Sequence, residues 1–161
     1  MTRLLLAAAS AAALSVASTG AEADTVRLDL QGAYGSNVGL LGPTTLHLVE
    51  TLNETSGGSL RVRFHEPNTF VPNLQSFDAV ANGSLDAAWA TPGFWTGKDI
   101  AFALIGAVPF GPRAGEYVAW LKFGGGRELW DELYESYNVK AIPCGVIPPE
   151  SSGWFREPIE R

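Results

Sequence analysis

The sequence predicts an α/β fold in which helices flank a mostly parallel β-sheet. Three segments have the short, alternating or apolar character of strands, and we assign them to residues 26–30, 60–64 and 85–90. Helical segments lie between these strands, and short glycine-rich turns join the elements. Strands that alternate with helices along a chain pair in parallel through crossover connections, so one sheet is expected.

The first strand is followed by a glycine-containing loop and then by a helix that begins near Pro43. Proline suits the first turn of a helix, because its missing N–H would have no partner there. Apolar residues recur at intervals of three on this helix, at Leu46, Val49 and Leu52. The pair Gly57 and Gly58 should end it, since glycine tolerates a positive φ.

The second strand, 60–64, places Arg61 and Arg63 on one outward face, where solvent is expected to cover them. A second helix is predicted over residues 74–82, with Asn73 as its N-cap and Gly83 after its end. Periodic apolar residues then predict helices over 115–123 and 127–137, separated by three glycines at 124–126. A broken strand is expected over residues 139–147, with Cys144 as a buried, inert thiol.

The N-terminal residues have the pattern of a secretory signal peptide. An apolar run over residues 4–14 follows Arg3, and small residues lead to a cleavage site after Ala23. We therefore expect residues 1–23 to be removed on export to the periplasm and residues 24–161 to form the mature part. A frayed amphipathic helix is the alternative, but this segment carries almost no polar face.

Composition excludes a nucleic-acid-binding protein of the usual kind. The 161 residues include 11 Lys and Arg against 17 Asp and Glu, for a net charge of -6. Such an acidic chain has no general attraction for nucleic acid or for an anionic membrane surface. A site for an anion would therefore depend on a local arrangement of donors.

The predicted topology indicates where a site would lie. Ligands of open parallel sheets bind beyond the carboxyl ends of the strands, which here are the loops 34–37, 65–69 and 91–95. The candidate ligand-binding residues, from these loops and from a later loop at 148–154, are Tyr34, Asn37, Phe94, Trp95, Glu150 and Trp154. Phe94, Trp95 and Trp154 either contact a ligand or pack beneath a second lobe. Glu150 is either a solvated loop acid or a ligand-facing one.

Catalytic and phosphate-binding motifs are weak in this sequence. None of the serines at 36, 76, 151 and 152 lies in a Gly-x-Ser-x-Gly turn. The three glycines at 124–126 lack the Lys-Ser or Lys-Thr of a phosphate loop, so they are interpreted as a helix breaker. His47 and His65 have no metal-ligand spacing.

Five runs of the sequence carry a resemblance to a known family, and they lie at 95–102, 107–112, 117–120, 142–147 and 153–156. They resemble the solute receptors of tripartite ATP-independent periplasmic (TRAP) transporters, the DctP family, and most closely the branch that captures 2-oxo acids such as pyruvate. The resemblance implies a periplasmic binding protein type II-like lobe, one of two α/β lobes that close around a small carboxylate. It also implies delivery of the ligand to TRAP membrane permease subunits, driven by an ion gradient, and a possible homodimer of the full-length protein.

The resemblance further implies a clamping arginine in a Gly-Leu-Lys-x-Arg context, which does not occur before Arg161. Residues 24–161 are therefore expected to form the first lobe and to stop at the start of the second, which is largely missing. Arg156 matches the family's Trp-Phe-Arg motif and is not the clamp. Glu150 stands where relatives commonly have a ligand-binding glutamine, and a carboxylate there would suit a bridging cation such as sodium. No other cofactor is expected.

The sequence leaves three functional alternatives. The first is a receptor, not an enzyme, that binds a small carboxylate. The second is a periplasmic enzyme on the same fold, with Glu150 as its acid or base. The third is a truncated lobe without a function of its own, which would expose the surface that a partner lobe should cover.

Overall fold

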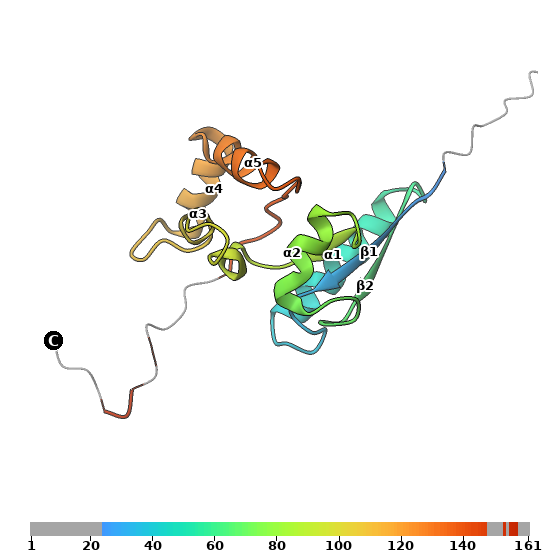
Figure 1. Cartoon of the computed structure of the whole chain (residues 1–161), viewed down its shortest axis with the longest axis horizontal. Coiled ribbons are helices and arrows are strands. Elements are labelled where there is room, and N and C mark those ends of the chain that lie inside the picture. The colour runs from blue at the N-terminus through green and yellow to red at the C-terminus, as the bar shows by residue number, and fades with distance from the viewer. Residues whose placement is uncertain (1–23, 148–152, 154, 158–161) are drawn as a thin grey trace, which may run out of the picture.

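The computed structural model describes residues 24–147, 153 and 155–157. Within them, three strands form one sheet in the order β2-β1-β3, and both neighbouring pairs are parallel. The strands are β1 (Val26–Gly32), β2 (Leu60–His65) and β3 (Ala87–Trp89). The predicted α/β class with a parallel sheet is therefore confirmed (Figure 1). The predicted signal peptide lies outside the described residues.

The predicted helices are also present, with small shifts at their ends. They are α1 (Leu41–Thr55), α2 (Ser76–Ala81), α4 (Ala114–Phe123) and α5 (Gly126–Glu135). Three further pieces were not predicted: the 3₁₀ turns η1 (Asn73–Gln75) and η2 (Pro92–Trp95) and the short helix α3 (Ala101–Gly106). In Figure 1, α1, α2 and the strands make up one half of the chain, and α3, α4 and α5 make up the other.

One small core lies between α1 and the sheet. Val49 of α1 packs against Leu30 and Val62, which are buried on neighbouring positions of β1 and β2. The alternation predicted for both strands explains this packing, because every second side chain points to the same face. The stripe predicted on α1 is only partly buried, since Leu46 and Leu52 remain exposed.

Side chains of α1 also hydrogen-bond to the backbone of β2. The amide of Asn53 donates to the Val62 carbonyl at 2.9 Å and accepts from the Val62 N–H at 2.7 Å. The Ser56 hydroxyl donates to the carbonyl of Leu60 at 3.0 Å. These bonds satisfy backbone groups on the side of β2 that does not face β1, where no strand pairs with it in the described part of the chain.

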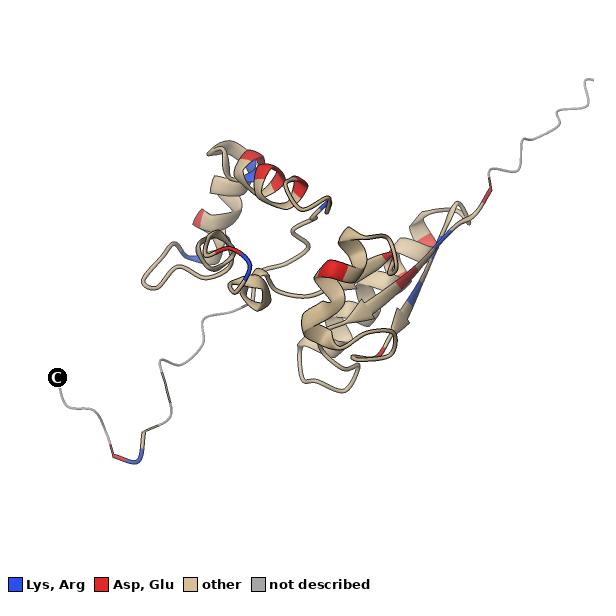
Figure 2. Cartoon of the chain, viewed as in Figure 1, with Lys and Arg blue, Asp and Glu red and all other residues tan. Residues whose placement is uncertain are grey.

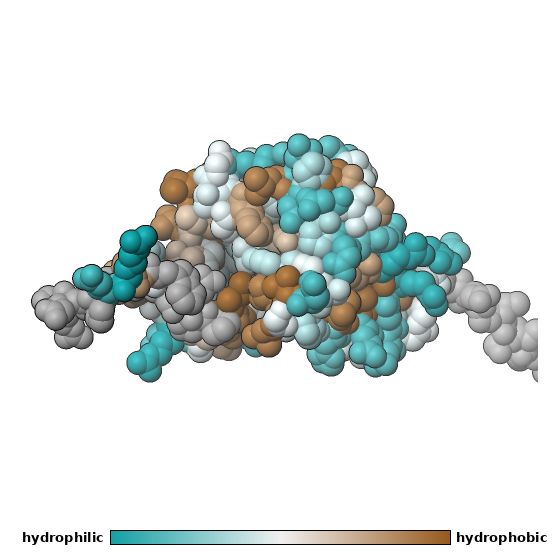
Figure 3. Space-filling view, turned by 90° about the horizontal axis from the view of Figure 1, so that it is seen from below, coloured by the Kyte–Doolittle hydropathy of each residue, from teal (hydrophilic) through white to brown (hydrophobic). Residues whose placement is uncertain are grey.

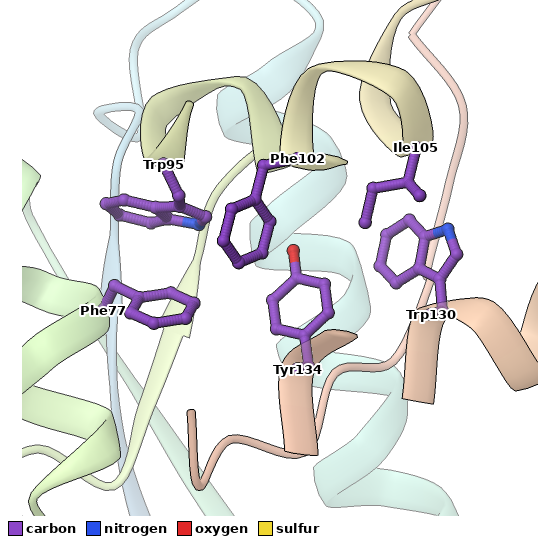
Figure 4. Packing of buried hydrophobic residues seen from close by; sticks show 6 residues of the cluster. All are labelled: Phe77, Trp95, Phe102, Ile105, Trp130 and Tyr134. Atoms are coloured by element: carbon purple, nitrogen blue, oxygen red, sulfur yellow. The ribbon is translucent and has the colours of Figure 1, made fainter. Parts of the chain in front are cut away.

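The larger core is mostly aromatic and joins the two halves of the chain. It is formed by Phe77, Trp95, Phe102, Ile105, Trp130 and Tyr134, drawn in Figure 4. Phe77 comes from α2, and its ring centroid lies 5.2 Å from that of Trp95 and 5.5 Å from that of Phe102. Aromatic rings at such distances and tilted angles attract one another beyond the effect of their burial. This aromatic cluster therefore fixes α3 and α5 against α2.

The turn between α4 and α5 confirms the three glycines as a helix breaker. Gly125 has a φ of 82°, a conformation that other residues rarely adopt. A Cβ atom on Gly126 would lie 2.6 Å from the ring of Trp120, so only glycine leaves room for that ring. The sequence motif thus allows both a sharp reversal and close packing of Trp120.

Two expectations for the segment after α5 are wrong. Residues 139–147 form no strand, because no described strand offers them a backbone partner. Cys144 was expected to be buried, but this residue is exposed. Its thiol is partly desolvated all the same, and this desolvation raises its pKa.

Acidic and basic positions lie close together along α5 (Figure 2), and their side chains hold the segment that follows this helix. The Arg127 guanidinium donates to both carboxylate oxygens of Asp131 at 2.9 Å and to the Ala141 carbonyl at 3.2 Å. Lys140 donates to Asp131 and to Glu135, each at 3.0 Å. Hydrogen bonds from Arg127, and then from Lys140, lower the pKa of Asp131 from 3.8 to about 2.

This ion-pair network predicts an acid-sensitive contribution to stability. Because the pKa of Asp131 is lower in the folded chain, its contribution is complete above an ordinary carboxyl pKa and is lost as the pH falls from about 4 to about 2. Thermal unfolding between pH 2 and pH 5 should therefore show a shallower pH dependence for Asp131→Asn than for the unsubstituted chain. Glu132→Gln, an exposed neighbour on α5, is the control and should keep the original slope. Equal slopes for all three proteins would contradict this role of Asp131.

Within the described residues, none of the helices combines the length and the apolar character that a membrane span needs.

Candidate functional site

The carboxyl ends of the three strands meet at one end of the sheet, as the sequence predicted. Gly32, His65 and Trp89 end their strands there, and the loops that follow lie next to one another. We use the name strand-end site for Tyr34, Asn37, Thr91 and Phe94, which these loops carry. Three of these four residues were predicted from the sequence, and Thr91 belongs to a loop that was.

Tyr34 connects the loop after β1 to the loop after β3. Its hydroxyl lies 3.4 Å from the hydroxyl oxygen of Thr91, and its ring centroid lies 5.9 Å from that of Phe94. The Ala33 N–H donates to the Trp89 carbonyl at 2.8 Å, which holds the two loops together just before Tyr34. A hydroxyl pair and two rings therefore lie side by side, and Tyr34 is only half-buried.

The two neighbouring aromatic residues of η2 have different surroundings. Phe94 is 37% exposed beside Tyr34, so a ligand could reach its ring. Trp95 is only 4% exposed and belongs to the aromatic cluster. Trp95 was expected to contact a ligand or to pack beneath a second lobe, but its ring packs within this chain's own aromatic cluster. Phe94 remains a candidate for ligand contact.

Asn37 is exposed in the loop between β1 and α1. The neighbouring Ser36 binds the carboxylate of Glu66 through both its N–H, at 3.1 Å, and its hydroxyl, at 2.5 Å. The sequence predicted that the loop 65–69, which contains Glu66, lies at the site, but Glu66 was not among the predicted site residues. A lone acid in a loop gives no local signal that two donors 30 positions earlier will bind it.

A buried glutamine fixes the loop after β2, and sequence reasoning missed it too. Gln31 is 1% exposed, and its amide donates to the Val71 carbonyl at 2.9 Å. Its carbonyl oxygen accepts from the N–H groups of Phe70, at 2.8 Å, and Val71, at 3.3 Å. The Gln31 side chain thus takes the place of a strand partner for residues 70 and 71. A polar residue at a strand's apolar end was the available signal.

Asn73 does not cap the helix as predicted. Its side-chain N–H₂ donates to the Ala33 carbonyl at 3.0 Å, so it holds the loop after β1 instead. Its side-chain oxygen is buried without a hydrogen-bond partner among the described residues. The Asn73 side chain thus adds a further attachment for the loop that carries Tyr34.

Glu150 and Trp154, the remaining predicted site residues, lie outside the described residues. The predicted cation at Glu150 is therefore not tested by the geometry. In the described part of the chain, no group of three or more His, Cys, Asp or Glu side chains could hold a metal ion.

The described surface carries a number of exposed apolar side chains. Figure 3 shows apolar residues gathered near the middle of one face and bordered by polar ones. Among all the described large apolar side chains, whichever face they lie on, the ones exposed by about 70% or more are Ile100, Phe110, Phe123 and Ile142. Apolar surface of this kind is typical of regions that another part of a protein covers.

Comparison with known proteins gives consistent matches. Residues 36–145 match the family of bacterial extracellular solute-binding proteins, family 7 (DctP). The chain is 32% identical over 107 residues to a monocarboxylate 2-oxoacid-binding periplasmic protein of Nostoc sp. (strain PCC 7120). The matched segment covers 66% of this chain and 29% of the Nostoc protein.

Solved structures agree with this match. A TRAP periplasmic solute-binding protein of Pseudoalteromonas atlantica, with bound sodium and pyruvate, has a TM-score of 0.66 and 32% identity over 70% of this chain. A TRAP solute-binding protein of Bordetella bronchiseptica, a dimer with calcium and picolinate bound at one site, has a TM-score of 0.65 and 27% identity over 71% of this chain. In both cases the match covers 34% of the other chain, so this chain spans about a third of these relatives. The parallel-sheet lobe described above is the fold they share with it, and the chain belongs to the DctP family of bacterial extracellular solute-binding proteins.

Proposed function

We propose that this chain supplies one wall of the ligand site in a periplasmic TRAP receptor that captures a small carboxylate, a 2-oxo acid such as pyruvate. The observation that carries the proposal is the meeting of Tyr34, Thr91 and Phe94 at the carboxyl ends of parallel strands. The relatives named for 2-oxo acid or pyruvate binding support the ligand class. The receptor would deliver its ligand to TRAP permease subunits in the membrane.

The chemistry of this wall suits a small, partly apolar ligand. Hydroxyl groups and the exposed amide of Asn37 can donate to carbonyl or carboxylate oxygens, and the half-exposed rings can cover a methyl group. None of the four residues carries a positive charge. A pair of charge-assisted bonds from an arginine contributes about 1.5–3 kcal/mol each, against the roughly 8 kcal/mol that micromolar affinity requires. Tight binding therefore needs a cationic wall that we assign to the second lobe.

The remaining features of the proposal follow the sequence expectations. Residues 1–23 direct export, and Glu150 and Trp154 contribute to the same ligand site. A carboxylate at position 150 would repel a bare anion, so a cation such as sodium is proposed to lie between them. The sodium bound to the Pseudoalteromonas protein and the calcium bound to the Bordetella protein support the proposed cation. The dimer of the Bordetella protein supports a homodimer. We propose no catalytic role.

The experiment titrates pyruvate into the 161-residue chain and follows amide resonances by NMR. We expect weak binding, with shifts confined to the loops of the strand-end site. The shifts should be smaller for Tyr34→Ala than for the control Phe123→Ala, an exposed residue on α4 outside the site. Methyl pyruvate, which lacks the charge, should bind less well than pyruvate, and sodium chloride should support binding better than choline chloride. Equal shifts with pyruvate and with chloride alone would refute the proposed site. Micromolar affinity by calorimetry would refute the need for a cationic second lobe.

A further inference from the structure

We infer that Glu66 is a positioning residue, whose carboxylate holds residues 33–40 so that Tyr34 and Asn37 stay at the strand-end site. Residues 33–40, called the first loop below, join β1 to α1. The significance of this contact for binding rests on the proposed function, but the contact itself can be tested without a ligand.

The geometry of the contact is that of a two-point attachment. The Ser36 N–H donates to one carboxylate oxygen of Glu66 at 3.1 Å, and the Ser36 hydroxyl donates to the other at 2.5 Å. Hydrogen bonds to an ionised carboxylate are shorter and stronger than those between neutral groups. Because both oxygens are used, the Glu66 side chain fixes the orientation of Ser36 as well as its position.

Glu66 is itself held in place by the turn that follows β2. Its carbonyl accepts hydrogen bonds from the Thr69 hydroxyl at 2.6 Å and from the Thr69 N–H at 3.3 Å. Asn68, inside this turn, has a φ of 63°, which asparagine tolerates better than most residues. The carboxylate is therefore presented from a closed turn at the end of a strand.

The opposite side of the first loop packs closely against the start of α1. A Cβ atom on Gly42 would lie 2.2 Å from the Ser36 carbonyl oxygen, so the helix and Ser36 already touch through backbone atoms. A Cβ atom on Gly35 would lie 3.2 Å from a carboxylate oxygen of Glu66. Ser36 is thus enclosed by α1 on one side and by Glu66 on the other.

Other attachments of the first loop lie nearer to β1. Ala33 is hydrogen-bonded to Trp89 at 2.8 Å and to Asn73 at 3.0 Å. The hydroxyl oxygens of Tyr34 and Thr91 are farther apart, at 3.4 Å. Among the described side chains, Glu66 is the one charged group hydrogen-bonded to this loop. Without Glu66, the stretch around Asn37 would lose both hydrogen bonds to a charged group, and the loop would keep only its attachments at Ala33 and Tyr34.

A negative charge beside a site for an anion would otherwise be unfavourable. Like charges a few ångströms apart repel, which would weaken the binding of a carboxylate ligand. Both carboxylate oxygens of Glu66 accept hydrogen bonds from Ser36, so we assign Glu66 the role of positioning the loop and not of contacting the ligand. This arrangement predicts that Ser36→Ala, which keeps the charge and the backbone N–H bond, and Glu66→Ala, which removes both bonds, both reduce loop order, with the smaller effect in Ser36→Ala.

The test measures amide hydrogen exchange and ¹⁵N relaxation in the full 161-residue chain without ligand. Exchange at the Ser36 amide should be about tenfold faster or more in Glu66→Ala, the change expected when a hydrogen bond to a charged group is lost. Glu66→Gln keeps one acceptor oxygen and should give an intermediate rate. The control Glu54→Ala, an exposed acid on α1, should leave Ser36 unchanged.

Relaxation at Tyr34 and Asn37 provides the second readout. Both Glu66→Ala and Ser36→Ala should increase the fast motion of these two residues, while the melting temperature and the amides of the aromatic cluster stay near those of the unsubstituted chain. Unchanged exchange at Ser36, or unchanged relaxation at Tyr34 and Asn37, would overturn the inference. A loss of order throughout the chain would also overturn it, because Glu66 would then be a general structural residue.

The two proposals fail separately. Loop order is measured without ligand, so an absence of pyruvate-induced shifts would refute the proposed function and leave the positioning result intact. Conversely, pyruvate shifts that persist unchanged in Glu66→Ala would show that the site exists and that Glu66 does not position it.

Discussion

Replacing Phe102 by alanine is expected to lower the free energy of unfolding by about 3–5 kcal/mol, the usual range for a buried phenylalanine. Phe102 is 0% exposed and lies at the centre of the aromatic cluster. Its ring centroid is 5.5 Å from that of Phe77 and 5.2 Å from that of Tyr134, so the substitution removes contacts between α2, α3 and α5 at once. Small domains have a total stability of about 5–15 kcal/mol, so a large part of it would be lost.

Urea denaturation followed by tryptophan fluorescence measures this change, because Trp95 and Trp130 belong to the same cluster. The control is Phe123→Ala, which removes an equal side chain that is 87% exposed on α4. This control should change the unfolding free energy by less than about 0.5 kcal/mol, as surface substitutions usually do. Similar losses for the two variants would mean that the aromatic cluster does not hold the halves of the chain together.

The second large effect is expected at Gln31. Substitution by leucine keeps a similar volume but leaves the N–H groups of Phe70 and Val71 and the carbonyl of Val71 without their side-chain partner. Each buried polar group left unpaired costs about 1–3 kcal/mol. Because water can reach part of this loop, we expect a total loss of about 2–4 kcal/mol in unfolding free energy.

Denaturation measures the loss of stability, and amide exchange at Phe70 and Val71 identifies its cause. These two amides should exchange faster in Gln31→Leu, while those of the aromatic cluster should follow the global change only. Gln75→Leu, an exposed glutamine in η1, is the matched control and should be close to neutral. If exchange at Phe70 and Val71 did not change, Gln31 would not be the group that fixes this loop.

The strands and the main helices could be predicted because their signals are local. The alternation in 60–64 reflects which side chains of β2 face α1. The three-residue spacing in α1 indicated a helix, but of its three residues only Val49 is buried against the sheet. Helix α3 gave a weaker signal, since it has only six residues and its burial depends on rings from α2 and α5. Residues 139–147 have a strand-like composition, but a strand also needs a backbone partner, which composition does not reveal.

The site was predicted in outline for a similar reason. Parallel topology determines which loops meet, and Tyr34 and Phe94 do lie together there. Trp95 has the same local context as Phe94, so sequence alone could not separate the exposed ring from the buried one. The attachments made by Gln31 and Glu66 join residues about 30 to 40 positions apart, and no periodic pattern records such pairs.

The hydrogen bonds from Asn53 and Ser56 to β2 determine how the sheet can grow. An edge strand with unpaired N–H and C=O groups can pair with a strand of another chain, and such pairing leads to aggregation or domain swapping. On the outer edge of β2, the backbone groups of Val62 and the carbonyl of Leu60 are already hydrogen-bonded to Asn53 and Ser56. A strand approaching this edge would find these groups occupied. A further strand would therefore add beside β3, the other outer strand of the described sheet.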